Sequence, residues 1–373
     1  MLYHHHPDLS SVLLRYDSFL NKLKAQIKII IYKSSTDIIQ TIQSWKPHDY
    51  QFALDSICEN VWRLEITRNI YGRKKRVIQG LALLIKHDRP NIYVVITHEK
   101  SDYVKNGLQT FFNKYYPDIA KTYLTSNNQE RILENLERKT NGKIFSTRLI
   151  AYKKNKRKNA RRSIESIVKY IDESFIDSFK KARENDEWVN KIDFQLLCPE
   201  IISKPSSHTE SIKQKVIFNG YLSHPGILKC NKNFSAFYKN IVEDVAAIGA
   251  ENKIFFDKRA RIKEEDYKSK PVIIEYDYPI FSDKEQNARL INALFELPKS
   301  SCSVFHANPY VHTSIVDYID GSAYDIWVLS SNRISVVPQM KSTFASFERL
   351  CDHIFRKFKE GALKNFEVSD YDR

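Results

Sequence analysis

Glycine and cysteine are scarce in this sequence, and the scarcity excludes several classes of protein. Only nine glycines occur among 373 residues, and no segment matches the glycine-rich loops with which P-loop and dinucleotide-binding proteins hold phosphate groups. The five cysteines are widely spaced and form no C-x-x-C pair, so we expect neither a disulfide framework nor a cysteine-rich zinc site. This cysteine usage is typical of a reducing cytoplasm, where we expect the protein to be located.

Long apolar runs are missing as well. No stretch approaches the roughly 20 apolar residues of a membrane span, and the first seven residues lack the pattern of a signal peptide. Hydrophobic residues nevertheless make up 42% of the chain and aromatic residues 12%, which is enough to build a folded core. Because 373 residues exceed the size at which one core usually keeps growing, we expect two domains.

Charge is the most informative feature of the composition. The formal net charge is +14, and residues 1–200 hold 35 Lys and Arg against 23 Asp and Glu, whereas residues 201–373 hold 24 against 22. The excess of positive charge therefore belongs to the first half of the chain. A lopsided basic half predicts a polyanionic partner, and we expect that partner to be DNA or RNA.

Two basic clusters supply most of this excess. Clustered like charges repel one another unless a counter-charge is near, and phosphate is the commonest counter-charge, so we interpret both clusters as nucleic-acid-binding segments. A neighbouring tyrosine in each cluster could stack on an unpaired base. The first cluster consists of Arg68, Tyr71, Arg73, Lys74, Lys75 and Arg76, and the second of Tyr152, Lys153, Lys154, Lys156, Arg157, Lys158, Arg161 and Arg162.

Alternating and helical patterns predict sheet and helix in both halves. In the first half, strands at 61–70 and 77–86 enclose the first basic cluster as a hairpin turn, and a strand at 143–152 leads into the second. Apolar spacing predicts one long helix from 163 to about 188. We expect a basic α+β domain at 1–197 and a linker at 198–215, where Pro and Ser interrupt the periodicity.

The second domain, 216–373, is nearly neutral, and we expect it to be a scaffold or partner-binding unit. A helix over 234–248 should stop at Gly249, a residue type that favours helix ends, and a strand at 253–256 should follow. Further strands are expected at 271–278 and 303–319, the latter as one long strand or a bent pair broken at Asn308-Pro309. The predicted fold class is α+β in both halves, with largely antiparallel sheets and helices packed on one face of each.

Carboxylates in the second half allow an alternative function. If 271–278 is a strand, Glu275 and Asp277 point to one face, and with Asp257 they could hold Mg²⁺ in a nuclease similar to the PD-(D/E)xK class. The lysine that this class carries after its second acid is absent. His306 and His312, if they lie on one extended strand, are about 20 Å apart and too distant to share an ion.

The sequence therefore favours an accessory nucleic-acid-binding protein without a resident cofactor. The alternatives are a magnesium-dependent nuclease and a subunit of a larger complex that meets a protein partner through its second domain. A composition rich in Lys, Asn, Ile and Tyr is typical of AT-rich bacterial genomes, and we expect a setting such as a mobile-element or phage-defence system. No membrane association is expected.

Overall fold

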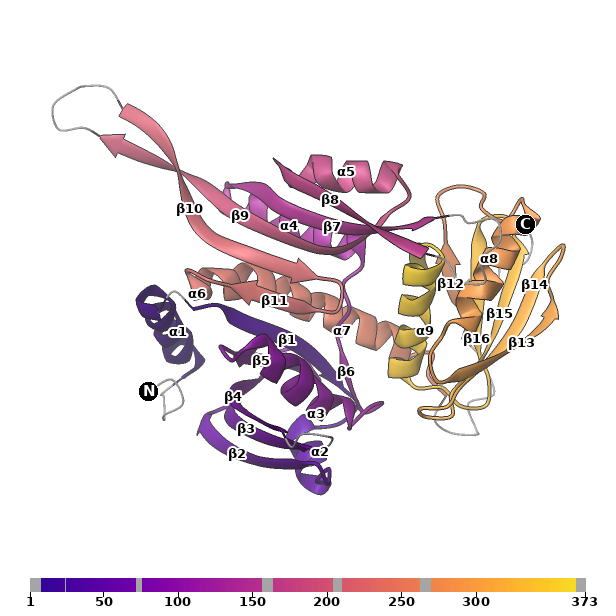
Figure 1. Cartoon of the computed structure of the whole chain (residues 1–373), viewed down its shortest axis with the longest axis horizontal. Helices are drawn as coiled ribbons and strands as arrows, with labels where there is room; N and C mark the ends of the chain where they lie inside the picture. The colour runs from indigo at the N-terminus through magenta and orange to yellow at the C-terminus, as the bar shows by residue number, and fades with distance from the viewer. Residues whose placement is uncertain are drawn as a thin grey trace. The chain divides into compact units, whose positions relative to one another are not determined.

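The computed structural model describes residues 8–23, 25–71, 76–155, 164–203, 210–261 and 270–366. The chain divides into two compact units, Met1–Ala250 and Glu251–Arg373. Each unit contains an antiparallel sheet and packed helices (Figure 1). The predicted α+β class with antiparallel sheets is therefore confirmed.

The first unit is built on a sheet in which the described residues form eleven strands. Their order is β2-β3-β4-β5-β1-β11-β10-β9-β7-β8, with the short β6 paired to β1 off this path. The strands are β1 (Ile27–Ser34), β2 (Tyr50–Cys58), β3 (Val61–Ile70), β4 (Arg76–Lys86), β5 (Ile92–Thr97), β6 (Ile119–Lys121), β7 (Lys143–Asn155), β8 (Ile164–Ser174), β9 (Trp188–Ser203), β10 (Glu210–Ser223) and β11 (Ile227–Cys230).

Helices cover one face of this sheet, which we call the inner face, across most of its strands. Alternate apolar side chains from β4 to β9, such as Ile29, Val94 and Leu222, form a single buried core with these helices, as the period of two along a strand requires. The helices on the inner face are α1 (Leu9–Leu23), α4 (Ser126–Thr140), α5 (Phe175–Glu184), α6 (Phe234–Phe237), η2 (Tyr238–Val242) and α7 (Glu243–Asp257).

The opposite face, which we call the outer face, has a smaller core that covers only part of it. Helices α2 (Ile38–Ser44), η1 (Tyr103–Gln109) and α3 (Thr110–Asn113) pack on side chains of β2, β3, β4, β5 and β1. Tyr32 of β1 meets Phe112 of α3 with ring centroids 4.3 Å apart. Among the described residues of β7, β8, β9, β10 and β11, only Ile227 of β11 belongs to this second core. The half of the outer face formed by β11, β10, β9, β7 and β8 is called the open half below.

The second unit contains an antiparallel sheet of six strands among the described residues, in the order β13-β14-β15-β16-β12-β17. Helices α8 and α9 pack beside it, and the side chains of Thr343 and Ser346 cap the first turn of α9 reciprocally. The elements are β12 (Val272–Glu275), α8 (Lys284–Phe295), β13 (Ser300–His306), β14 (Val311–Asp317), β15 (Ala323–Ser330), β16 (Arg333–Pro338), α9 (Phe344–Lys357) and β17 (Ala362–Asn365).

Within the predicted linker at 198–215, the described residues 198–203 and 210–215 belong to β9 and β10. These strands pair from Ser203 and Glu210 down to Lys191 and Ser223 and extend together as a two-stranded arm (Figure 1). Proline at 199 interrupts the sequence pattern but sits in β9, which beyond Leu197 has β10 as its partner, and strands with a free edge tolerate proline. The two compact units instead divide within α7, at Ala250 and Glu251.

Two further elements were predicted with the wrong period. The segment 163–188 is not one helix but the strand β8 followed by α5, because its β-branched residues pair with β7 from Asn155 to Phe145. The predicted helix end at Gly249 and strand at 253–256 are also wrong, since α7 continues through both. A Cβ at Gly249 would meet the Thr122 hydroxyl at 2.7 Å, so this glycine permits close packing inside the helix rather than ending it.

In the first unit, the sequence did not reveal α2, β2, β6, β9 or β11. Helix α2 is short, and its start is stabilised by Asp37, whose carboxylate accepts the backbone N–H groups of Ile39 and Gln40. No helix in the described part of the chain is long and apolar enough to cross a membrane.

Candidate functional site

The predicted basic clusters fall between paired strands of the first unit, the first between β3 and β4 and the second between β7 and β8. Arg73, Lys74 and Lys75 are outside the described residues, as are Lys156, Arg157, Lys158, Arg161 and Arg162 and the side chain of Lys154. The flanking strand ends are described, however. They fix where each turn leaves the sheet.

These two turns leave the sheet at opposite ends. Neighbouring strands pair antiparallel throughout, so strand direction alternates across the sheet. Strand β7 is six places beyond β4 and therefore runs in the same direction. The start of β4, which adjoins the first cluster, and the end of β7, which adjoins the second, therefore lie at opposite ends of the sheet and roughly 30 Å apart across the strands.

The described cations of the first cluster are paired with acids of their own unit. Arg68 is 3.4 Å from the Asp49 carboxylate and donates to the Asn106 carbonyl at 2.6 Å, with its guanidinium over the Tyr50 ring. Arg76 forms an ion pair with Asp102. Tyr71 is 75% exposed. Arg68 and Arg76 are therefore each paired with an acid of the fold, although Arg68 shares Asp49 with Lys114, which lies 3.3 Å from the same carboxylate.

The described part of the second cluster adjoins the open half of the outer face. Tyr152 of β7 stacks on Trp188 of β9 with ring centroids 5.0 Å apart, and its hydroxyl lies 3.5 Å from the Asn190 amide nitrogen. Lys153 is near enough to Glu187 to lower the pKa of that carboxyl, although burial outweighs this effect and the pKa is raised overall.

A row of polar side chains crosses the open half at right angles to the strands. The row continues beyond the open half onto β1. Lys28 on β1 is opposite Lys229 on β11, and Lys229 is opposite Tyr221 on β10. Tyr221 in turn is opposite Asp193 on β9, and Asp193 is opposite Arg148 on β7. Five strands thus place five polar residues in one register row, on the face that the helices α2, η1 and α3 leave free.

The electrostatics of this row are unbalanced. Burial lowers the pKa of Lys229, and the nearby charges of Lys191 and Arg148 lower it further, while Asp193 opposes them. Burial likewise lowers the pKa of Lys28, with a further contribution from Lys229, while the charge of Glu99 opposes them and the Glu99 backbone carbonyl accepts a hydrogen bond from the Lys28 ammonium at 2.6 Å. The one acid of the row, Asp193, is occupied by Arg148, which donates to it from Nε at 2.9 Å and from Nη2 at 2.7 Å. Lysines held opposite each other raise the free energy of the fold, and an anion would relieve that repulsion.

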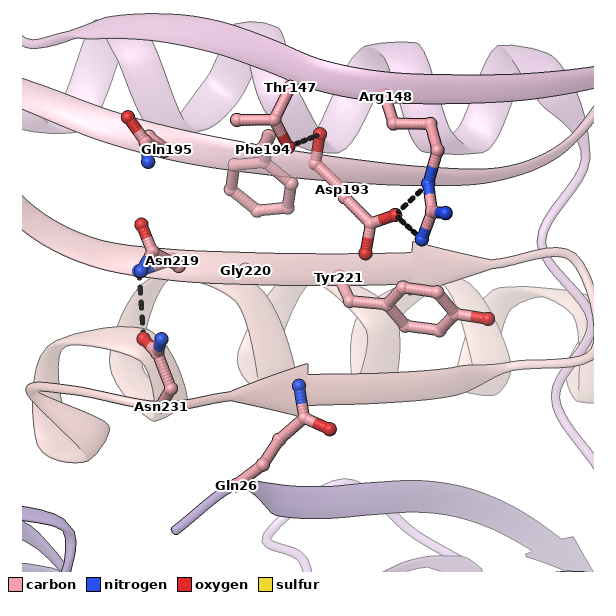
Figure 2. Close-up of a pocket in the computed structure, with 10 residues that line it drawn as sticks. All are labelled: Gln26, Thr147, Arg148, Asp193, Phe194, Gln195, Asn219, Gly220, Tyr221 and Asn231. Atoms are coloured by element: carbon pink, nitrogen blue, oxygen red, sulfur yellow. Dashed lines mark hydrogen bonds and ion pairs between the residues drawn. The ribbon is translucent and has the colours of Figure 1, made fainter. Parts of the chain in front are cut away.

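A cavity of about 440 Å³ adjoins this row. Figure 2 shows side-chain amides at one end, from Gln195, Asn219, Asn231 and Gln26, and the phenol of Tyr221 with the Arg148–Asp193 pair at the other. The Lys229 ammonium lies 4.3 Å from the centroid of the Tyr221 ring. Burial raises the pKa of the Tyr221 hydroxyl, so this group stays protonated and can donate a hydrogen bond at neutral pH.

Backbone packing shapes the cavity at Gly220. Phe194 points to the inner face, and its ring lies so close to Gly220 that a Cβ there would meet it at 2.3 Å. Because Gly220 has no side chain, the Phe194 ring can pack directly against the backbone of β10. Asn219 and Tyr221, on either side of Gly220, line the cavity.

Sequence reasoning missed this site. Its cations come singly from separate strands, so no run of charge marks them, and only the register of five strands brings them together. An available signal was the placing of Lys28 and Lys229 inside otherwise apolar strands, where a charged residue requires a partner or a function.

The carboxylates proposed for a metal ion are not brought together. Asp257 forms an ion pair with Lys253 one turn earlier in α7, and Glu275 lies 2.9 Å from Arg333 and 3.9 Å from Lys364. Strand β12 ends at Glu275, so Asp277 lies in a bend instead of alternating with it. Among the described residues, no three His, Cys, Asp or Glu side chains form a group that could hold a metal ion.

His306 and His312 are much closer than the sequence suggested. The chain folds back between them, and they are direct neighbours across the β13–β14 hairpin, with ring centroids 6.5 Å apart. The estimate of about 20 Å assumed one continuous strand. His312 also stacks on Trp327 at 3.5 Å, so these rings form an aromatic stack on the second sheet.

The sequence matches no known protein family, and no curated protein shows detectable similarity to it.

Proposed function

We propose that the protein binds nucleic acid through the open half of the outer face of its first unit. The observation that carries this proposal is the row from Lys28 to Arg148, in which three cations share one acid that is already paired. Lys191 lies close to this row, and Lys169 faces the same side, opposite Ile150 on β7.

A nucleic acid fits this surface in charge and in the kind of side chain present. Phosphates would neutralise Lys229, Lys191 and Lys169 and release the counterions condensed on the strand. The aromatic rings of Tyr221, Tyr152 and Trp188 supply apolar surface for bases. A cation-rich face with aromatic rings between the charges is typical of single-strand binding.

The proposal changes the role of the predicted clusters. The first cluster emerges from the sheet at the end opposite to the second, and its described cations are balanced by Asp49 and Asp102. The interface proposed here therefore depends on the face itself, and the second cluster remains a predicted extension of it beyond Tyr152.

A salt titration tests the proposal. Replacing Lys169, Lys191 and Lys229 together with Gln should flatten the slope of log K against log salt by about 2, because each lost phosphate contact removes roughly 0.7 to 0.9. At about 0.1 M salt the affinity for a mixed-sequence single-stranded oligonucleotide should fall by roughly 100-fold.

The matched control removes three exposed lysines from helices of the inner face, Lys22, Lys180 and Lys239. Both triple variants lose the same net charge, so non-specific attraction changes equally. Equal slopes for the two variants would contradict the proposed interface, whereas a change confined to the first would support it.

A second candidate function, binding of a protein partner, is favoured by the second unit. Phe305 on β13 and Leu329 on β15 are 59% and 62% exposed, and exposed apolar side chains on a sheet surface can mark interaction sites. If such a partner exists, Phe305→Ser with Leu329→Ser should abolish its co-purification at high salt while leaving oligonucleotide binding unchanged. Retention of the partner by this variant would argue against the candidate.

A further inference from the structure

The cavity beside the charged row contains chemistry that phosphate binding does not use. Its amides come from four separate places in the chain: Gln26 before β1, Gln195 on β9, Asn219 on β10 and Asn231 after β11. Cations alone would suffice for a backbone-only interface. Four amides converging on one cavity indicate a ligand with several hydrogen-bond donors and acceptors.

The hydrogen bonding of these amides leaves capacity facing the cavity. Asn231 accepts the backbone N–H of Asn219 through Oδ1 at 3.2 Å, which fixes its orientation. The Oδ1 atom of Asn219 is buried and has no hydrogen-bond partner among the described residues. Figure 2 marks no contact between the Gln26 or Gln195 side chains and the other residues drawn. A buried acceptor without a partner costs free energy, and the residue that carries it lines the cavity.

The remaining parts of the cavity match the remaining parts of a nucleotide. Among the lining residues, Tyr221 offers an aromatic ring for stacking and Arg148 offers positive charge. Lys229 does not line the cavity but lies beside the Tyr221 ring in the same register row. Asp193 binds Nε and Nη2 of Arg148 and so orients the guanidinium. The volume of about 440 Å³ lies in the range of roughly 300 to 1,000 Å³ that is usual for small-molecule sites.

We propose that this cavity binds one nucleotide unit, with the amides on the edge of an unpaired base and Lys229 and Arg148 near its phosphate. The inference rests on the proposed function and adds base recognition to it. The bound unit belongs either to a single strand or to a free mononucleotide, which share this chemistry. A base inside a duplex cannot enter, because its hydrogen-bonding edge is already paired.

Abasic oligonucleotides test the inference. Labelled octamers of dA, dC, dG and dT, and an abasic octamer with the same phosphates, would be titrated at one salt concentration. The protein should bind at least one homopolymer about 5- to 100-fold more tightly than the abasic octamer, the range that a pair of hydrogen bonds to a base provides. Equal binding of all five octamers would overturn the inference and leave the proposed function standing. Binding of none would overturn both.

A double variant assigns the base dependence to the cavity. Gln195→Met with Asn219→Leu keeps the size and charge of both side chains and removes their amides, so the preference over the abasic octamer should disappear while the salt slope stays unchanged. The control, Gln40→Met with Asn113→Leu, makes the same changes at exposed positions of α2 and α3. Loss of preference in the control, or its survival in the cavity variant, would overturn the assignment.

Displacement by mononucleotides identifies the source of the nucleotide. If AMP, GMP, CMP or TMP displaces the preferred octamer below millimolar concentration, the cavity binds free nucleotides, and Gln195→Met with Asn219→Leu should abolish displacement. If none displaces it while the base preference holds, the unit belongs to a strand. Displacement that this variant leaves intact would contradict binding in the cavity.

Discussion

The two halves of the outer face of the first sheet differ sharply, although both belong to one continuous antiparallel sheet. The half from β2 to β1 carries Leu64, Leu84 and Val95, all fully buried under helices. The open half presents Tyr221, Asp193 and Arg148 at the equivalent pleat positions. The first half is covered by helices and stabilises the fold, whereas the second half carries polar side chains and is the surface proposed for a ligand. The polarity of the side chains on a sheet face can therefore indicate a candidate binding surface where no sequence motif does.

The largest expected effect that would test this contrast is on the stability of the covered half. Phe112→Ala should lower the free energy of unfolding by about 3 to 5 kcal/mol, because it removes a fully buried ring that packs on Tyr32. Denaturant unfolding measures the loss. Ile167→Ala, which truncates a residue 60% exposed on β8, should change stability by no more than about 0.5 kcal/mol. Similar losses for the two variants would show that the halves do not differ as described.

A smaller effect is expected at Arg68, which the sequence assigned to binding. Arg68→Gln should destabilise the protein by about 1 to 3 kcal/mol, because it leaves the Asn106 carbonyl and the Asp49 carboxylate without this donor. The slope of log K against log salt for an oligonucleotide should stay unchanged. A flatter slope with normal stability would return Arg68 to the interface.

The smallest effect concerns the pH dependence of binding. The pKa of Lys229 in the folded protein is lowered, first by burial. The charged ammonium therefore destabilises the folded protein by its full amount at pH values below that pKa, and this destabilisation is lost as the pH rises through it. A bound phosphate favours the ammonium form. Affinity should therefore begin to fall at a pH below 10.5, the ordinary value for lysine, and Lys229→Arg should move the fall to higher pH. Identical pH profiles for the two proteins would exclude a phosphate contact at Lys229.

The elements that the sequence located are those whose pattern is local. Strands β3 and β4 agree with the predicted ranges 61–70 and 77–86 to within one residue, because both strands and the turn between them are close in the sequence. The strand β8 was mistaken for a helix because Ile164, Ile167, Val168 and Ile171 satisfy a helical spacing as well as a strand. Its identity is decided by pairing with β7, which no local window contains.

The candidate site was less predictable than the fold. Contiguous basic runs attract attention in a sequence, yet the described cations at the first run are paired with acids within the unit. The residues of the row from Lys28 to Arg148 are instead scattered between positions 28 and 229. Such a row follows from strand order and register. Likewise, the proximity of His306 and His312 depends on a hairpin that turns one expected strand into two.

Protection of lysines from acetylation by a bound oligonucleotide tests the central claim most directly. With mass spectrometry as the readout, saturating single-stranded DNA should protect Lys169, Lys191 and Lys229 on the open half and leave Lys22, Lys180 and Lys239 of the inner-face helices as reactive as before. Protection of the inner-face lysines with no change at the open half would contradict the account.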